Sequence, residues 1–221
     1  MPGPVPVITI DGPSGSGKGT IADRAARSLG YHLLDSGSLY RILGCVAAQE
    51  NLDFNNAKAL SALAKRLDIR FGESGPGSVT VDRVDFSEII RSEEAGTLAS
   101  RVGEIPDVRQ ALLARQKAFR QPPGLVADGR DMGTVVFPDA AVKIFLTASA
   151  EERADRRYKQ LIAKGIGAKL PDLLQELKVR DQRDSNRAVS PLKPAEDACV
   201  LDTTRMTIDE VVARVLSLVK Q

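Results

Sequence analysis

Short apolar runs alternate along the chain with longer stretches in which apolar residues recur at helical spacing. The runs at 5–11, 31–35, 125–128, 142–146 and 198–202 are rich in Val, Ile and Leu, and the pattern is typical of buried strands. Strands that alternate with helices predict an α/β fold, in which a parallel five-stranded sheet carries helices on both faces. Ligands bind such sheets beyond the carboxyl ends of the strands.

The stretches with helical spacing complete this pattern. Helices are expected at 21–29, 36–48, 55–66, 92–102, 106–120 and 206–220. Pro122, Pro123 and Gly124 end the helix that precedes the strand at 125–128.

One region departs from the alternation. Asp68–Phe71 and Ser78–Asp82 have the composition of short strands around the turn Gly75–Gly77, which predicts a small inserted subdomain containing a β-hairpin. The expected organisation is a core at 5–50, 92–150 and 195–221, an inserted substrate-binding subdomain at about 55–91 and an arginine-rich helical lid at about 151–190.

A glycine-rich segment joins the first strand to the first helix. Glycines let the backbone curl so that several N–H groups point at one anion, and Lys18 adds a charge that reaches the β- and γ-phosphates of a nucleotide. The spacing matches the phosphate-binding (Walker A) pattern through Lys18, but Gly19 stands where Ser or Thr is expected. This Gly-Lys-Gly-Thr ending resembles the nucleoside-monophosphate kinases, so a P-loop NTPase-like fold is expected. The predicted ATP-binding residues are Gly12, Pro13, Ser14, Gly15, Ser16, Gly17, Lys18, Gly19 and Thr20.

Asp128 ends the strand expected beside the first strand. Its carboxylate should lie at the carboxyl edge of the sheet, where it can hold Mg²⁺ or the waters of the ion. Thr20 is the second candidate ligand, either directly or through water.

Basic residues are concentrated between 151 and 193. Arg153, Arg156 and Arg157 share one helix face, and Arg180, Arg183 and Arg187 repeat at similar spacing around Asp184. Lys164–Gly167 between these clusters is a predicted hinge. A solvated pair of helices would also explain the charges, but beside a phosphate loop they favour a closing lid, because phosphoryl transfer depends on positioning and on cationic stabilisation.

Arginines outside the lid bear on the acceptor. Arg41, Arg130 and Arg109 could bind a second phosphate, because the guanidinium group binds phosphate oxygens in pairs. A phosphate acceptor is already anionic and needs no general base.

Four stretches together resemble the bacterial cytidylate kinases. They are Ile10–Thr20, Leu33–Arg41, Ala127–Asp139 and Arg180–Pro191, in the order found in that family. The resemblance implies transfer of the γ-phosphate of ATP to CMP or dCMP, with Mg²⁺ as cofactor.

The resemblance also implies roles for individual residues. Ser14, Arg41 and Arg130 would hold the acceptor phosphate, and Arg180 and Asp184 would contact the sugar. The residues around cytosine would be Ser36, Ser100, Arg109, Asp131 and Arg187. Apart from the resemblance, the phosphate loop, the strand-end carboxylate and the arginine clusters predict that catalysis rests on Lys18, Arg130, Asp128, Arg153 and Arg157.

Cytosine carries an exocyclic amino donor beside the acceptors N3 and O2. Asp131 can accept from that amino group, and arginines can donate to the acceptors. Uracil reverses this pattern at N3 and C4, so such a site should prefer cytosine.

Charge and composition narrow the alternatives. The formal net charge of +2 provides no general field for nucleic acid, and the N-terminus lacks the pattern of a signal peptide. A cytoplasmic protein, monomeric and without nucleic-acid or membrane partners, is expected. Cys45 and Cys199 are expected to be reduced.

Other functions remain open at this point. The chain could be another small P-loop kinase, acting on shikimate, gluconate or uridylate. It could also be a GTP-dependent switch, although it lacks an Asn-Lys-x-Asp motif, or a nucleotide sensor or nucleic-acid binder that uses the basic lid.

Overall fold

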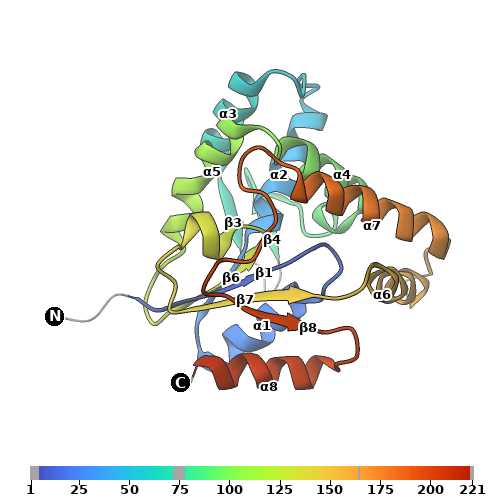
Figure 1. The fold of residues 1–221 in the computed structure, drawn as a ribbon. Helices are drawn as coiled ribbons and strands as arrows, with labels where there is room; N and C mark the ends of the chain where they lie inside the picture. The colour runs from blue at the N-terminus through green and yellow to red at the C-terminus, as the bar shows by residue number, and fades with distance from the viewer. Residues whose placement is uncertain (1–4, 72–77, 164, 220–221) are drawn as a thin grey trace. The chain divides into compact units, whose positions relative to one another are not determined.

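The computed structural model describes residues 5–71, 78–163 and 165–219, and the chain divides into two compact units (Figure 1). Unit 1 comprises Met1–Asp35 and Lys117–Gln221, and unit 2 comprises Ser36–Gln116. The second unit is therefore larger than the predicted insert at about 55–91, since it also includes helices from both sides of that region.

Unit 1 contains a five-stranded sheet in which every pair of neighbouring strands is parallel. The strand order is β2-β6-β1-β7-β8, with bounds β1 Val7–Asp11, β2 His32–Asp35, β6 Leu125–Gly129, β7 Val142–Thr147 and β8 Cys199–Asp202. This confirms the predicted parallel sheet, and the central position of β1 places the segment that follows it in the middle of the carboxyl edge.

One face of this sheet is covered by α1 (Lys18–Leu29) and α8 (Ile208–Val219), as Figure 1 shows. Ile8 and Ile10 of β1 point into this layer and are almost fully buried. Since side chains alternate along a strand, Thr9 and Asp11 point to the opposite face. There they contact the short π-helical turn η2 (Met132–Val136).

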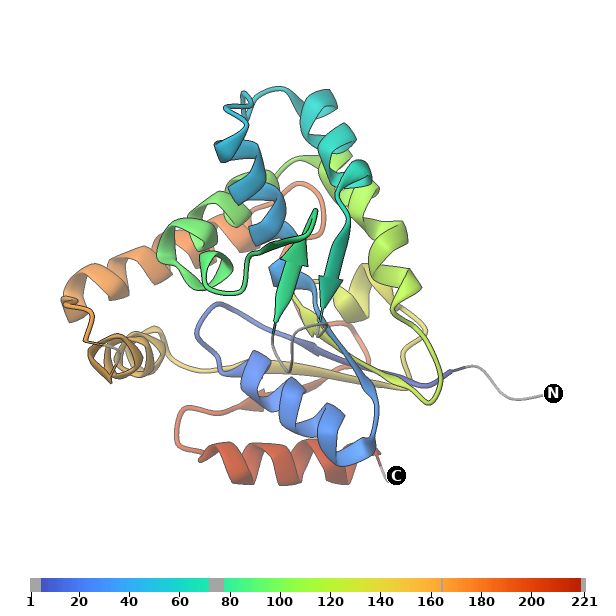
Figure 2. The same ribbon diagram turned by 180° about the vertical axis from the view of Figure 1, so that it is seen from behind.

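The arginine-rich segment forms two helices that pack on each other, α6 (Ala150–Ala163) and α7 (Leu170–Ser185). Ala154, Leu161 and Leu173 form a small apolar core between them. Figure 2 shows the pair from behind. The segment therefore has an apolar core of its own as well as its charged residues.

Unit 2 combines helices with a small antiparallel sheet of order β3-β4-β5. Its elements are α2 Ser36–Gln49, α3 Ala57–Arg66, β3 Ile69–Phe71, β4 Val79–Val81, β5 Val84–Asp85, the 3₁₀ turn η1 Ile89–Arg91, α4 Glu93–Val102 and α5 Pro106–Ala118. Helices α2 and α4 pack closely at Gly44, where a Cβ atom would lie 2.8 Å from the Cβ of Leu98.

The predicted hairpin is confirmed, because β3 and β4 pair as antiparallel strands. The turn Gly75–Gly77 lies outside the described residues, as do Lys164 of the predicted hinge and Lys220 of the closing helix. Cys45 and Cys199 are both free thiols. Within the described ranges, none of the helices combines the length and the hydrophobicity that crossing a bilayer requires.

Candidate functional site

The backbone of Gly12–Gly17 turns sharply between β1 and α1. Gly12 lies directly against β7, where a Cβ atom would be only 2.1 Å from the carbonyl oxygen of Leu146. Its φ of +154° and this close approach both require glycine. The start of the loop is thereby held in place against the centre of the sheet.

Helix α1 begins without a side-chain cap. Gly17, its N-cap residue, has φ 85°, and the first turn of the helix carries no acidic residue. By contrast, the Ser92 side chain caps α4, whose first turn contains Glu93 and Glu94. The first N–H groups of a helix need acceptors, and its dipole favours an anion there. The start of α1 therefore has the properties of a phosphate-binding site.

Lys18 is the first residue of α1, and its side chain is buried beneath the loop. Its Nζ donates a hydrogen bond to the carbonyl oxygen of Pro13 at 3.1 Å. Burial lowers the pKa of Lys18 to about 7, and the positive charges of Arg130 and Arg180 act in the same direction against the carboxylates of Asp128 and Asp35. In the unliganded site the charged form of Lys18 is thus disfavoured.

Asp128 lies on β6 beside Ile10 of β1, as the sequence predicted. Burial raises its pKa to about 7, although the charge of Lys18 opposes the shift. Among the described residues, none donates a hydrogen bond to its Oδ1 atom. A Cβ atom at Gly19 would lie 3.3 Å from Oδ2. The glycine at this position thus lets the first turn of α1 approach the carboxylate closely.

Asp11, the last residue of β1, binds the turn that follows Arg130 and Asp131. Its Oδ1 accepts a hydrogen bond from the N–H of Met132 at 2.9 Å, and its Oδ2 accepts one from Gly133 at 2.8 Å. Burial raises the pKa of Asp11 to about 6, even though both amide hydrogen bonds favour the carboxylate. The sequence alone indicates no role for Asp11. The available signal was a carboxylate at the end of an otherwise apolar strand.

Asp184 of α7 gathers arginines from two parts of unit 1. Its Oδ2 accepts a hydrogen bond from Nε of Arg130 at 3.0 Å, and its Oδ1 accepts one from Arg187. Burial acts to raise the pKa of Asp184, but Arg130, Arg187 and Arg180 outweigh it, so the pKa lies below its usual value. The network connects Arg130, a predicted contact of the acceptor phosphate, to α7.

Arg153 of α6 is buried, and its guanidinium group binds protein atoms. It donates to the carbonyl oxygens of Ser14 at 2.9 Å and Ala148 at 3.0 Å. It also forms a bidentate pair with Asp181 of α7, with distances of 2.5 and 3.1 Å. In this conformation Arg153 of α6 therefore connects the phosphate loop to α7. Nothing in the sequence singles out Asp181 as the partner of Arg153.

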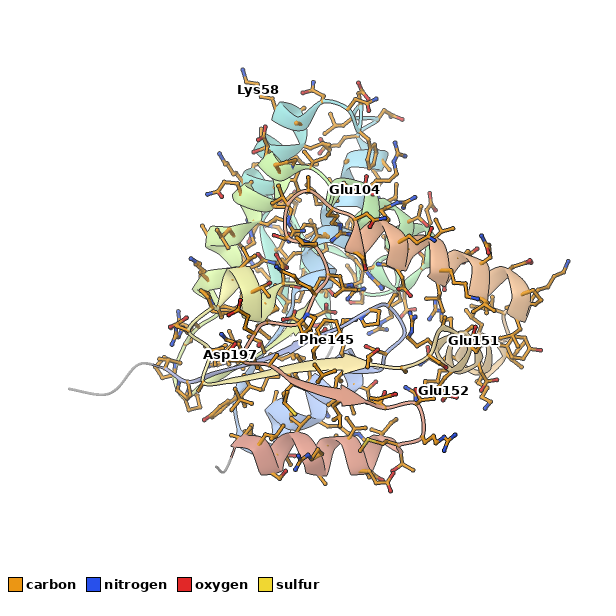
Figure 3. All side chains as sticks on the ribbon, in the orientation of Figure 1. Lys58, Glu104, Phe145, Glu151, Glu152 and Asp197 are labelled. Carbon is orange, nitrogen blue, oxygen red and sulfur yellow. The ribbon has the colours of Figure 1, made fainter. Side chains whose placement is uncertain are left out.

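The neighbouring arginines of α6 differ from Arg153. Arg156 pairs with Glu152 at 2.8 Å and donates to the carbonyl oxygen of Thr203 at 2.6 Å, so it anchors the helix. Figure 3 labels Glu151 and Glu152 at the start of α6, where negative charge suits the helix dipole. Arg157 is only half-buried and has a long contact of 3.4 Å with Gln160.

The remaining predicted residues belong to unit 2. Ser36 begins α2, and Arg41 of the same helix donates to the carbonyl oxygen of Ile90 at 2.7 Å. Arg109 is buried, donates to the carbonyl oxygen of Gly103 at 3.2 Å and stacks over the ring of Tyr40. Ser100 is buried, and within the described part of the chain its hydroxyl has no hydrogen-bond partner.

The fold therefore groups the predicted residues by unit. Unit 1 holds the phosphate loop and the arginine network, which are Gly12–Thr20, Asp128, Arg130, Asp131, Arg153, Arg157, Arg180, Asp184 and Arg187. Unit 2 holds Ser36, Arg41, Ser100 and Arg109.

Comparison with known proteins gives a consistent family assignment. The family model described as cytidylate kinase matches residues 8–221. A cytidylate kinase of Stutzerimonas stutzeri is 58% identical over 217 residues, which cover 97% of this chain and 95% of that protein. A cytidylate kinase of Aeromonas salmonicida is 57% identical over 222 residues, covering 100% and 96% of the two chains.

Among solved structures, an uncharacterized protein from Eubacterium ventriosum has a similar fold. Its TM-score is 0.51 at 12% sequence identity, with 98% of this chain and 99% of that chain covered. The likeness concerns the fold alone. The family model and the full-length relatives together show that this chain belongs to the cytidylate kinase family.

Proposed function

We propose that the protein transfers the γ-phosphate of ATP to CMP or dCMP, which yields ADP and CDP or dCDP. The observation that carries this proposal lies within unit 1. There a phosphate loop leads into α1, which has no side-chain cap, and arginines form a network around Asp184. Membership of the cytidylate kinase family supports CMP as the acceptor. The family is one of ATP-dependent kinases.

The triphosphate of ATP binds the loop Gly12–Thr20 in this proposal. The N–H groups at the start of α1 donate hydrogen bonds to phosphate oxygens. Lys18 exchanges its contact with Pro13 for contacts with the β- and γ-phosphates. Bound phosphate then compensates the buried charge of Lys18. The loop backbone supplies the donors, and the glycines permit its curvature.

Magnesium is the proposed cofactor, with Asp128 and Thr20 as the residues that hold it or its waters. Oδ1 of Asp128, which has no hydrogen-bond partner in the described part of the chain, suits a hard cation, because such ions prefer oxygen ligands. When bound, the ion neutralises charge on the β- and γ-phosphates. The carboxylate of Asp128, ionised above about pH 7, would keep the ion at the carboxyl edge of the sheet.

Transfer proceeds in line, from ATP to the phosphate of the acceptor, and the arginines stabilise the charge on the moving group. Arg130 is the proposed contact of the acceptor phosphate, together with Ser14 and Arg41. Arg157 is the proposed lid contact. The contacts of Arg153 with Ser14 and Asp181 support a part in holding the phosphate loop.

In this proposal, polar side chains recognise the nucleoside of the acceptor. The proposed contacts of cytosine are Ser36, Ser100, Arg109, Asp131 and Arg187, and those of the sugar are Arg180 and Asp184. Ser100 supports this assignment, because among the described residues its buried hydroxyl has no hydrogen-bond partner, and buried polar groups need one.

The wider setting is proposed on the same grounds. We expect a monomeric, cytoplasmic enzyme that binds nucleotides and does not depend on nucleic acid or a membrane. Its proposed organisation is a core at 5–50, 92–150 and 195–221, a substrate-binding subdomain at about 55–91 and a lid at about 151–190. Size-exclusion chromatography with light scattering tests the monomer.

An acceptor screen tests the proposed function. ADP release from Mg-ATP is measured with CMP, dCMP, UMP, AMP, GMP, shikimate and gluconate. We expect strong turnover with CMP and dCMP, weak turnover with UMP and none with the others. Turnover with another acceptor would retain the kinase and exclude the cytosine site. No turnover together with salt-sensitive binding of RNA would favour the binding protein over the enzyme.

The lowered pKa of Lys18 predicts pH-dependent binding of ADP. The pKa of about 7 in the free site rises when an anion binds, so at pH 8.5 ADP binding takes up a proton. The affinity for ADP therefore decreases as the pH rises above about 7. Calorimetry at pH 8.5 in buffers of different ionisation enthalpy measures this uptake.

The matched variants for this measurement are Lys18→Met and Lys58→Met. Lys58 is an exposed lysine of α3, and its replacement should leave the proton uptake unchanged. Lys18→Met should lose most of the uptake. Equal uptake in the wild-type protein and Lys18→Met would show that Lys18 is not the titrating group.

A further inference from the structure

Asp11 makes an unusual contact for a residue at the end of a central strand. Both of its carboxylate oxygens accept backbone hydrogen bonds from η2, one from Met132 and one from Gly133. These N–H groups open the turn, where the backbone has no earlier carbonyl to bind. An ordinary turn of this kind is capped by the residue just before it.

In this chain that preceding residue is Asp131, and its side chain does not cap η2. Asp11 performs the capping from a neighbouring strand instead. The first two amides of the turn are therefore bound by a side chain of the sheet, whereas the later amides of Val135 and Val136 bind the backbone carbonyl of Asp131. Asp131 and Arg130, which come directly before the turn, are connected through it to β1.

The other end of Asp11 is equally constrained. Its backbone lies opposite Gly129 of β6 and Phe145 of β7, and the next residue, Gly12, packs against the carbonyl of Leu146. Gly133 also lies directly on β1, since a Cβ atom there would be 2.8 Å from Oγ1 of Thr9. These close contacts fix the position of η2 relative to the start of the phosphate loop.

We propose that Asp11 is a positioning residue for acceptor selection, which sets Arg130 and Asp131 in register with the phosphate loop by holding the first amides of η2. This inference rests on the proposed function, in which Arg130 binds the acceptor phosphate and Asp131 binds the base. Asp11 itself touches neither substrate. It acts through the backbone of Met132 and Gly133.

The isosteric variant Asp11→Asn tests the proposal. Asparagine offers one acceptor in place of two, and its NH₂ group opposes one of the N–H groups of η2. When a buried amide loses its hydrogen-bond partner, the free-energy cost changes an equilibrium constant by about tenfold. We therefore expect the ratio of kcat/KM for CMP to that for UMP to decrease by about tenfold.

This ratio separates positioning from stability. A purely structural role would lower the melting temperature and the amount of active enzyme, and both acceptors would lose turnover equally. Thr9→Val is the matched control, because it changes a side chain on the same face of β1. The variant removes the buried hydroxyl of Thr9, which has no hydrogen-bond partner among the described residues. The ratio should stay unchanged in Thr9→Val.

A second pair of variants addresses the same point without changing Asp11. Gly133→Ala pushes η2 away from β1, because the added Cβ meets the buried, branched side chain of Thr9. The CMP-to-UMP ratio should again decrease by about tenfold. Thr9→Ala in the same chain removes the obstruction and should restore the ratio to within about twofold of wild type. This pair decides the question if Asp11→Asn fails to fold.

The outcomes distinguish this inference from the proposed function. A wild-type protein that prefers CMP, with an unchanged ratio in folded Asp11→Asn or in Gly133→Ala, overturns only the role of Asp11. If the wild-type protein does not phosphorylate CMP, the proposed function is wrong, and so is the role of Asp11 in acceptor selection. A decreased ratio in Asp11→Asn and Gly133→Ala, with Thr9→Val unaffected, supports the proposal.

Discussion

Lys18→Met should lower kcat by about a thousandfold or more while the protein remains folded. Lys18 lies beneath the loop that precedes α1, and bound phosphate would stabilise the charge that burial disfavours. Methionine has a similar length but cannot stabilise the charge of the moving phosphoryl group. Steady-state turnover with Mg-ATP and CMP measures the effect.

The stability of this variant separates a chemical effect from a structural one. Burial lowers the pKa of Lys18, which means that the fold disfavours its charged form. Removing the charge should therefore leave the melting temperature of the unliganded protein unchanged or raise it. Lys58→Met on α3 is the control and should retain wild-type turnover. A folded Lys18→Met with near-normal kcat would contradict the assignment of the phosphate loop.

Asp131→Ala should lower kcat/KM for CMP by about a hundredfold, and clearly more than it lowers that for UMP. Asp131 is buried, and in the proposed site its carboxylate accepts a hydrogen bond from the amino group of cytosine. UMP carries a carbonyl oxygen at that position and makes no such bond. Parallel kinetics with both acceptors give the comparison.

Asp139→Ala is the control for this prediction. Asp139 lies in the same connection between β6 and β7, but it is exposed and pairs with Arg120. The same chemical change there should leave the preference for CMP intact. The turn η2 should survive Asp131→Ala, because the Asp11 carboxylate binds its first two amides and the Asp131 side chain does not cap it. Equal losses with CMP and UMP would remove Asp131 from base recognition.

The parts of the site that depend on local sequence were predictable. Gly12–Thr20 lies between β1 and α1, and Asp128 lies beside β1. Both placements follow from local signals, because apolar runs indicate the strands and a glycine-rich turn before a helix indicates the loop. The five-stranded parallel sheet was predictable for the same reason. The short strand β5 was missed, since a strand of two residues has no periodicity to detect.

Contacts between distant residues were not predictable. Asp11 contacts Met132 only once the sheet has formed, and Arg153 contacts Asp181 only once α6 and α7 have packed together. A carboxylate at the end of a strand has the same local sequence whether it faces water or caps a distant turn. The order of the strands, which decides this, is not visible in a single sequence.

The division of the chain has a consequence for its synthesis. Unit 2 is continuous, whereas the sheet of unit 1 uses strands from both sides of it. Both neighbours of β1, the strands β6 and β7, are translated only after unit 2 is complete. We therefore expect unit 2 to fold first on the ribosome, before β6 and β7 are available to pair with the apolar strand β1. During that interval β1 is the segment of the nascent chain most exposed to aggregation and most in need of a chaperone.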